Sequence, residues 1–105
     1  MSERIVIVGY KPHVGKEDRL VELLRSHVHK LQAEGLATDR EPIIAKASDG
    51  SFVEVFGWKS VDAITAAHSN AEVQKMWSEF AEVCDYVPVG SLPETKNLFS
   101  EFSSL

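Results

Sequence analysis

The segment FVEVFGW, residues 52–58, constrains the fold of this chain most, because it reads as a β-strand with apolar side chains on both faces. Successive side chains of a strand point to opposite faces of the sheet, so the segment divides into two sets. One face carries Phe52, Glu54, Phe56 and Trp58, and the other carries Val53, Val55 and Gly57. Both faces therefore need a covering layer, and one of them places a carboxylate among three aromatic rings.

Three further apolar runs predict strands, over residues 4–10, 42–48 and 85–91. The second run joins the FVEVFGW strand through Asp49-Gly50, a dipeptide typical of a type I′ hairpin turn. Pro88 cannot donate to a strand ladder, so the last strand belongs at an edge or a bulge. The strands are expected to pair antiparallel.

Apolar residues at helical spacing predict helices over residues 16–34, 61–68, 71–84 and 94–105. Gly35 follows the first helix, where a helix C-terminus takes a left-handed residue. Ser60 is suited to cap the second helix, and Ser69–Glu72 and Ser91–Glu94 have the spacing of capping boxes for the other two. The apolar stripe of the terminal helix consists of Leu98, Phe102 and Leu105.

This order of elements predicts one α+β domain over residues 1–105, with a ferredoxin-like four-stranded antiparallel sheet and helices on one face. Val53 and Val55 then lie on the open face, where an apolar surface requires cover. A homodimer that pairs the two open faces is the economical arrangement, since two-fold dimers are the commonest oligomers. The helical tail at about residues 94–105 is expected to pack across the dimer seam.

The composition narrows the classes of partner. The net charge is −5 and the eleven Lys and Arg residues are scattered, whereas nucleic acids and anionic membranes need a cationic surface. We therefore expect neither partner. No apolar run reaches the length of a membrane span, and the first residues enter a strand pattern, so we expect a cytoplasmic protein. Cys84 is the only cysteine and reads as a small core residue.

Five residues carry a resemblance to a known family. The order of elements over residues 4–92, together with Trp58-Lys-Ser60, Ala67-His68 and a following Trp77, resembles the dimeric α/β-barrel proteins of the antibiotic biosynthesis monooxygenase type. The resemblance implies that two ferredoxin-like sheets form a barrel and that the reactive cavity lies between the sheet and its helices. It implies activity less directly, because one fold hosts many functions.

Three ionisable side chains are predicted to point into that cavity. At 100° per residue, His27 lies within about 20° of Leu20 on the apolar stripe of its helix, and His68 lies within about 20° of Val61. Glu54 points to the same layer, where an unpaired carboxylate costs several kcal/mol unless a partner such as histidine compensates it. Each histidine alone is commonly a core residue bonded to a carbonyl, but together the three residues predict a catalytic cluster.

The cavity is predicted to take a small aromatic ligand. Its expected walls are the aromatic residues Tyr10, Phe52, Phe56, Trp58 and Trp77. His27, Glu54 and His68 are suited to remove a proton from a phenol or from a carbon beside a carbonyl. In the monooxygenases that the chain resembles, such deprotonation prepares an aromatic substrate to react with dioxygen without a metal or flavin, so no cofactor is expected.

Other functions stay open at this point. The same residues would serve an isomerase that shuttles a proton without oxygen, and a dimeric binding protein would hold an aromatic metabolite without turnover. Two histidines and a carboxylate also match the ligand types of a divalent metal triad. The haem-degrading branch of the superfamily requires an Asn on the first strand, and RIVIVGY contains none. Haem degradation is therefore not expected.

Overall fold

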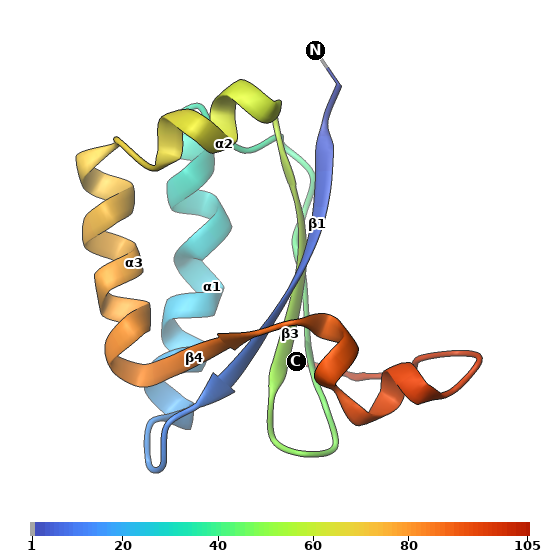
Figure 1. The fold of residues 1–105 in the computed structure, drawn as a ribbon. Coiled ribbons are helices and arrows are strands. Elements are labelled where there is room, and N and C mark those ends of the chain that lie inside the picture. Colours follow the sequence, from blue (N-terminus) through green and yellow to red (C-terminus); the bar gives the residue numbers. More distant parts are fainter. Residues whose placement is uncertain (1) are drawn as a thin grey trace.

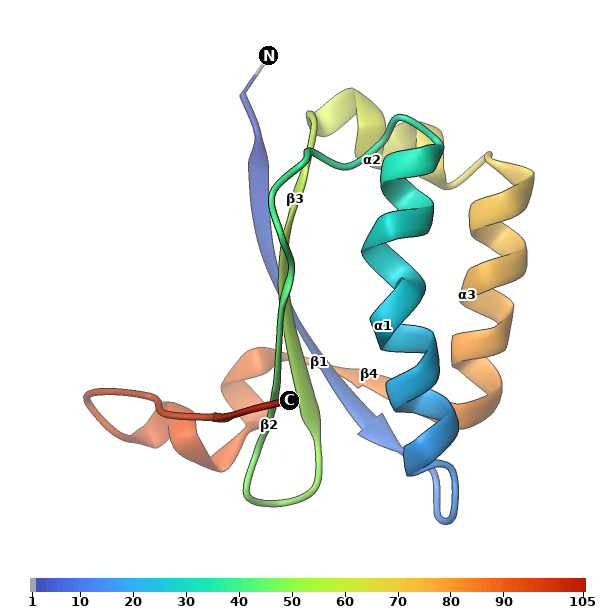
Figure 2. The ribbon, with the colours of Figure 1, turned by 180° about the vertical axis from the view of Figure 1, so that it is seen from behind.

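A computed structural model describes residues 2–105 and confirms the α+β, ferredoxin-like class. Three helices lie against one face of a five-stranded antiparallel sheet (Figures 1 and 2). No helix within the described residues has the length and apolarity to span a membrane. In chain order the elements are β1 (Arg4–Pro12), α1 (Glu17–Ala33), β2 (Ile43–Lys46), β3 (Phe52–Trp58), α2 (Val61–Ala67), α3 (Ala71–Val83), β4 (Cys84–Val87), the 3₁₀ turns η1 (Val89–Ser91) and η2 (Pro93–Lys96), and β5 (Ser103–Ser104).

The order of strands in the sheet is β4-β1-β3-β2-β5, so the FVEVFGW segment is its central strand. In the register of β1 and β3, Val8 stands opposite Glu54 and Tyr10 stands opposite Phe52. These side chains share the face that the helices cover. A short β4 lies at the edge, as Pro88 predicted.

Helix α1 ends as the sequence predicted. Gly35 has a φ of 75°, and its N–H bonds the carbonyl of Gln32 at 2.9 Å. The N–H of Leu36 reaches the carbonyl of Leu31, also at 2.9 Å. This pair of bonds is a Schellman motif, which only a left-handed residue at Gly35 permits without strain. The motif turns the chain back toward the sheet.

The β2–β3 hairpin differs from the predicted type I′ turn. Such a turn needs a positive φ at both central residues, but within the described residues only glycines have one. The connection instead has three residues between Ala47 and Ser51, and Gly50 is its left-handed position with a φ of 93°. The carboxylate of Asp49 accepts the N–H of Ser51 at 2.9 Å, which favours this longer loop.

The helix caps were predicted in part. Ser60 Oγ accepts the N–H of Ala63 at 3.1 Å and caps α2 as expected. The prediction of Ser69 as the cap of α3 was wrong, because Asn70 accepts the N–H of Val73 while the Ser69 hydroxyl donates to the carbonyl of Ala66. Asn and Ser are both good caps, and here the chain bends one residue later.

The C-terminal tail is not the α-helix that its stripe predicted. The Ser91 hydroxyl donates to the carbonyl of Pro88, and Glu94 Oε2 accepts the N–H of Ser48 at 2.7 Å. Neither residue is therefore free to form the expected capping box. The tail makes two 3₁₀ turns and then runs extended, and Ser103–Ser104 pairs with the edge of β2.

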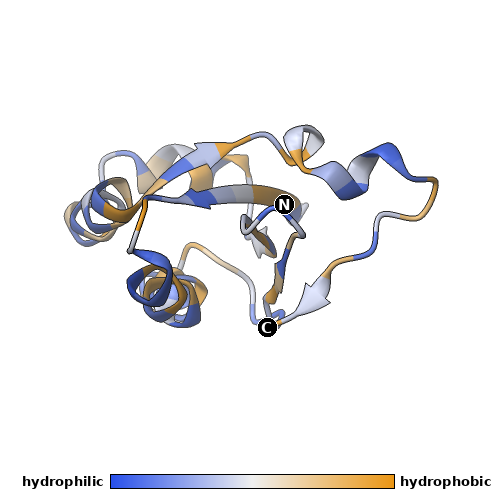
Figure 3. Cartoon of the chain, turned by 90° about the horizontal axis from the view of Figure 1, so that it is seen from below, coloured by the Kyte–Doolittle hydropathy of each residue, from blue (hydrophilic) through white to orange (hydrophobic). Residues whose placement is uncertain are grey.

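The open face of the sheet is half covered by this tail, which lies on the side away from the helices (Figure 3). Leu92 is buried against Ala45, Ala47 and Val53 and forms a second small core. Val53 is thus covered by its own chain, which corrects the expectation that a second copy alone would cover this face. The apolar residues of the sheet that stay exposed on this face are Ile5, Ile7 and Ile43.

Candidate active site

A buried cluster joins three elements behind an apolar pocket. The hydroxyl of Tyr10 on β1 donates to Oε1 of Glu54 on β3 at 2.7 Å. Nδ1 of His27 on α1 lies 2.8 Å from the same oxygen. Glu54 is completely buried and His27 nearly so, and within residues 2–105 the other carboxylate oxygen, Oε2, has no hydrogen-bond partner. One carboxylate oxygen therefore holds both a phenol and an imidazole in place.

The local structure explains why these side chains meet. Glu54 lies in the middle of the central strand, facing the helices, and His27 belongs to the buried stripe of α1. The imidazole ring is flanked edge-on by Phe56 at 5.5 Å and Phe80 at 5.0 Å between ring centroids. Burying a carboxylate without partners costs several kcal/mol, and two donors on Oε1 offset that cost. The two phenylalanine rings pack against the imidazole and help to hold it against Glu54.

The hydrogen bonds also set which imidazole nitrogen carries a proton. When Glu54 is ionised its carboxylate only accepts hydrogen bonds, and His27 then donates its Nδ1–H to Glu54. In a neutral imidazole the other nitrogen, Nε2, is then left with a lone pair. A proton taken up at Nε2 produces an imidazolium whose charge Glu54 stabilises at 2.8 Å. The pair is thus organised as an oriented base.

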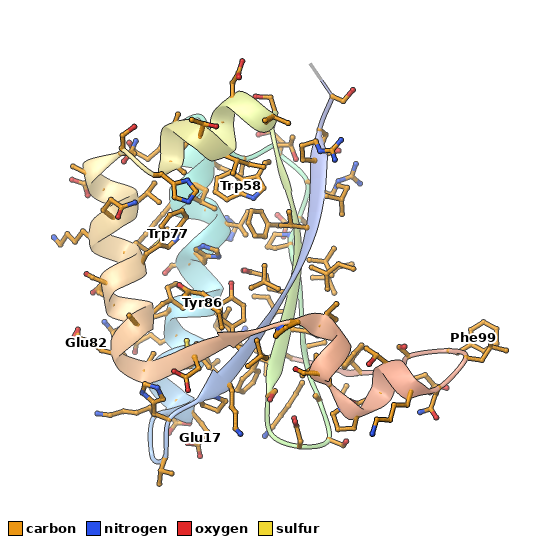
Figure 4. All side chains as sticks on the ribbon, viewed as in Figure 1. Glu17, Trp58, Trp77, Glu82, Tyr86 and Phe99 are labelled. Carbon is orange, nitrogen blue, oxygen red and sulfur yellow. The ribbon has the colours of Figure 1, made fainter. Side chains whose placement is uncertain are left out.

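The pocket next to this cluster has a volume of about 300 Å³, which is at the small end for ligand sites. Figure 4 shows Trp58, Trp77 and Tyr86 in the space between the helices and the sheet, contributed by β3, α3 and β4. The chain has two tryptophans, and both line this pocket. The complete lining is Val6, Val8, Tyr10, His27, Phe56, Trp58, Trp77 and Tyr86.

The predicted site residues divide into those that the structure gathers and those that it separates. His27, Glu54 and Tyr10 form the cluster, although Glu54 stands behind His27 and does not itself line the pocket. Four of the five predicted aromatic walls line the pocket in the structure: Tyr10, Phe56, Trp58 and Trp77. The fifth, Phe52, was misplaced: it is buried in the core under the Lys46 ammonium and does not reach the pocket.

The inward orientation expected for His68 was also wrong. His68 is exposed, and its Nδ1 lies 2.9 Å from the carbonyl of Ile64. The sequence predicted His68 to point inward because it lies on the same side of its helix as Val61. In the structure the buried residues of α2 are Ala63 and Ala67 instead. His68 touches the site only through its ring edge on Trp77, at 5.3 Å between centroids.

The metal triad that the sequence left open does not assemble. His68 lies apart from the hydrogen-bonded pair of His27 and Glu54. In the part of the chain that the structure describes, no three His, Cys, Asp or Glu side chains converge in a way that would hold a metal ion. Cys84 is buried with its thiol on the carbonyl of Phe80, and burial together with Asp85 raises the pKa of that thiol to about 11.

Tyr86 is the aromatic pocket residue that the sequence did not predict, and Val6 and Val8 also line the pocket. Tyr86 stands opposite Tyr10 in the β1–β4 register, on the same face of the sheet. Its ring centroid lies 5.5 Å from that of Tyr10 and 6.4 Å from that of Phe80. Tyr86 falls in the strand predicted over residues 85–91, but only the register with β1 shows that it faces the helices beside Tyr10.

Both tyrosines of the chain are expected to resist ionisation. Burial and the nearby Glu54 carboxylate raise the pKa of Tyr10 well above its usual 10.0, and burial first, then Cys84 and Glu54, raises the pKa of Tyr86 to about 12. An ultraviolet titration of the native protein should therefore show no tyrosinate at pH 10.0, where the unfolded chain is half ionised. Because the folded-state pKa values are raised, the stability they contribute is present below pH 10 and is lost as the pH rises toward 12. Tyr10 is 1% exposed, so a native Tyr10 that ionises at pH 10 would contradict its buried placement beside Glu54.

Comparison with known proteins supports the fold. No protein-family model and no curated protein matches the sequence. Among solved structures, SnoaB, a cofactor-independent oxygenase from Streptomyces nogalater, superimposes with a TM-score of 0.67 at 13% identity, over 90% of this chain and 100% of that one. A candidate antibiotic biosynthesis monooxygenase from Nitrosomonas europaea superimposes with a TM-score of 0.62 at 16% identity, over 81% of this chain and 86% of that one. The chain thus has the fold of the small antibiotic biosynthesis monooxygenases, as its resemblance predicted.

Proposed function

We propose that this protein is a cofactor-independent oxygenase of small aromatic substrates, with His27 as the base. The observation that carries the proposal is the placement of His27 between the buried Glu54 carboxylate and an aromatic-walled pocket. A base with an orienting carboxylate on one nitrogen and an apolar pocket at its ring is arranged for proton abstraction. The fold shared with a cofactor-independent oxygenase is consistent with this chemistry.

The reaction balances with dioxygen as the only co-reactant. His27 removes a proton from an acidic phenol or a CH₂ group beside an aromatic carbonyl, and the resulting carbanion gives one electron to O₂. The radical pair combines into a C–O–O⁻ peroxide, which takes up a proton. Loss of water then turns the reacting carbon, which is the CH₂ beside the carbonyl or a ring CH of the phenol, into C=O, so one oxygen atom enters the product and the other leaves as water. The substrate supplies all four electrons.

The residues around the base favour these steps. Glu54 stabilises the imidazolium that forms at His27, and the apolar walls keep water from competing for the carbanion. Tyr10 holds the carboxylate from its other side and remains protonated. Glu54 and Tyr10 are therefore positioning residues, and His27 is the group that meets the substrate.

An oxygen electrode tests this function. Hydroxylated naphthalenes and aromatic ketones with an acidic CH₂ should be oxidised with one O₂ consumed per product, by protein treated with a chelator and free of flavin. Proton transfer without oxygen uptake, detected as deuterium exchange at the same carbon, would replace the oxygenase with an isomerase. Binding without exchange or uptake would leave a small-molecule-binding protein.

We also propose that the rest of the open sheet face binds a second copy of the chain. Ile5, Ile7 and Ile43 are 51%, 53% and 62% exposed on this face, next to the half that the tail covers. Leu98 and Phe99 form an exposed apolar tip of the tail, and Figure 4 shows Phe99 projecting away from the domain. A two-fold axis would bring these surfaces of two copies together, since a two-fold interface is made of the same patch on both subunits.

The dimer can be tested with a charge on this face. Ile7→Lys places an ammonium where two copies would meet, and because the side chain is exposed the fold should lose less than about 0.5 kcal/mol. Sedimentation should show a dimer for the unmodified protein and a monomer for Ile7→Lys. Val14→Lys is the matched control, because Val14 is fully exposed in the loop before α1. If both variants sediment like the unmodified protein, this interface is wrong.

A further inference from the structure

The pocket contains a second phenol that the proposed mechanism does not use. The hydroxyl of Tyr10 is committed to Glu54, but Tyr86 lines the same pocket and makes no side-chain hydrogen bond within residues 2–105. Tyr86 is 52% exposed, so the rest of the chain leaves about half of this pocket residue uncovered. Apart from His27 and the two indole N–H groups, this hydroxyl is the polar group available to a ligand there.

The position of this phenol is fixed relative to the base. Tyr86 pairs with Tyr10 in the sheet, and its ring lies against the rings of Tyr10 and Phe80. Phe80 is fully buried and also contacts the His27 ring, at 5.0 Å between centroids. One buried aromatic ring therefore contacts both the phenol and the imidazole, and both residues line the pocket.

We infer that Tyr86 selects oxygenated aromatic substrates by donating a hydrogen bond to an oxygen on the ring system, while His27 faces the carbon or hydroxyl that loses its proton. This inference rests on the proposed function and names its substrate class: a phenol or aromatic ketone of about two fused rings, which suits a pocket of about 300 Å³. An unsubstituted aromatic hydrocarbon would fill the same space without this bond.

The protonation state of Tyr86 suits the role of donor. Burial, Cys84 and Glu54 raise its pKa to about 12, so the phenol keeps its proton across the neutral range and does not compete with His27 as a base. When the substrate loses its proton, negative charge develops on its oxygen. A hydrogen bond to an ionised acceptor is stronger than one to a neutral acceptor. Tyr86 therefore binds the deprotonated substrate more tightly than the neutral one.

Tyr86→Phe tests the inference, because it removes the hydroxyl and keeps the ring that packs on Tyr10 and Phe80. The indole N–H signals of Trp58 and Trp77 report occupancy of the pocket in a nitrogen-15 NMR titration. The unmodified protein should bind 2-naphthol more tightly than naphthalene. Tyr86→Phe should weaken 2-naphthol binding about fivefold, the value of one hydrogen bond of roughly 1 kcal/mol, and leave naphthalene binding unchanged.

Several outcomes would overturn the inference. They are equal binding of both ligands to the unmodified protein, absence of 2-naphthol binding, and a Tyr86→Phe variant that weakens both ligands equally, which would indicate packing alone. The titration needs neither oxygen nor turnover, so its result is separable from that of the proposed function. If Tyr86→Phe loses the preference for 2-naphthol over naphthalene but the unmodified protein consumes no oxygen, the binding role of Tyr86 stands and the oxygenase proposal is rejected.

Discussion

Replacing His27 by asparagine is expected to lower the rate of substrate-dependent oxygen uptake by about 10²–10⁴-fold while the protein stays folded. The amide of asparagine reaches the position of Nδ1, so it still donates a hydrogen bond to Glu54 and keeps the buried carboxylate paired. It places no base where Nε2 stands. The change therefore separates proton abstraction from structural support.

The matched control for this experiment is His29→Asn. His29 lies on the same helix but is exposed, so its replacement should leave oxygen uptake unchanged. Glu54→Gln is the complementary variant, because the amide oxygen still accepts from Tyr10 and His27 while the charge that stabilises the imidazolium is gone. The rate of oxygen uptake by Glu54→Gln should lie between the rates of His27→Asn and His29→Asn. Equal rates for His27→Asn and His29→Asn would show that His27 is not the base.

Replacing His27 by leucine is expected to lower the free energy of unfolding by about 3–5 kcal/mol near neutral pH. Leucine fills much of the space but leaves Glu54 as a completely buried carboxylate with Tyr10 as its one remaining donor, since Oε2 has no partner within residues 2–105. Breaking a buried pair by removing one member is costly because the other charge stays uncompensated. Urea unfolding followed by circular dichroism measures the difference.

The double variant His27→Leu with Glu54→Leu gives this prediction its control. Replacing both members by apolar residues removes the buried charge, so much of the lost stability should return. If His27→Leu costs less than about 1 kcal/mol, or if the double variant is less stable than the single one, then Glu54 does not depend on His27 and the cluster is not coupled.

The sequence predicted the elements that depend on local signals. Helix α1 followed from its apolar spacing and ended at Gly35 as expected, and Pro88 placed the last strand at an edge. Ser60 caps α2 as predicted, because its hydroxyl accepts the N–H of Ala63, only three residues along the chain. These features depend on neighbouring residues only, so the predicted helix end, cap and edge strand are found in the folded chain.

The helix predicted over residues 94–105 does not form, because contacts between distant parts of the chain decide the conformation of this segment. Glu94 was expected to bond within its own turn, but in the fold it accepts the N–H of Ser48, which is 46 residues away. Phe102 packs against the small core around Leu92 while Leu98 is exposed, so the predicted stripe of Leu98, Phe102 and Leu105 does not form. Tertiary contacts therefore decided the conformation of a segment with weak helical preference.

The candidate site was predictable where the pattern was strong. A carboxylate alternating with aromatic residues on a central strand predicted a buried partner for Glu54, and the apolar stripe of α1 placed His27 next to it. His68 was misjudged because a helix of seven residues gives too few buried positions to identify its inward face. Tyr86 was missed because only the strand register brings it beside Tyr10.

The assignment of His27 as the base is tested most directly by a nitrogen-15 NMR spectrum of its imidazole, recorded at the pH of the oxygen-uptake assay. If His27 is the base, Nδ1 carries the proton that bonds Glu54 and Nε2 is free to accept a proton from the substrate. His27→Asn identifies the signals by their loss. A ring protonated on Nε2, or an imidazolium that keeps both protons at that pH, would leave no base in the pocket and would contradict the proposed function.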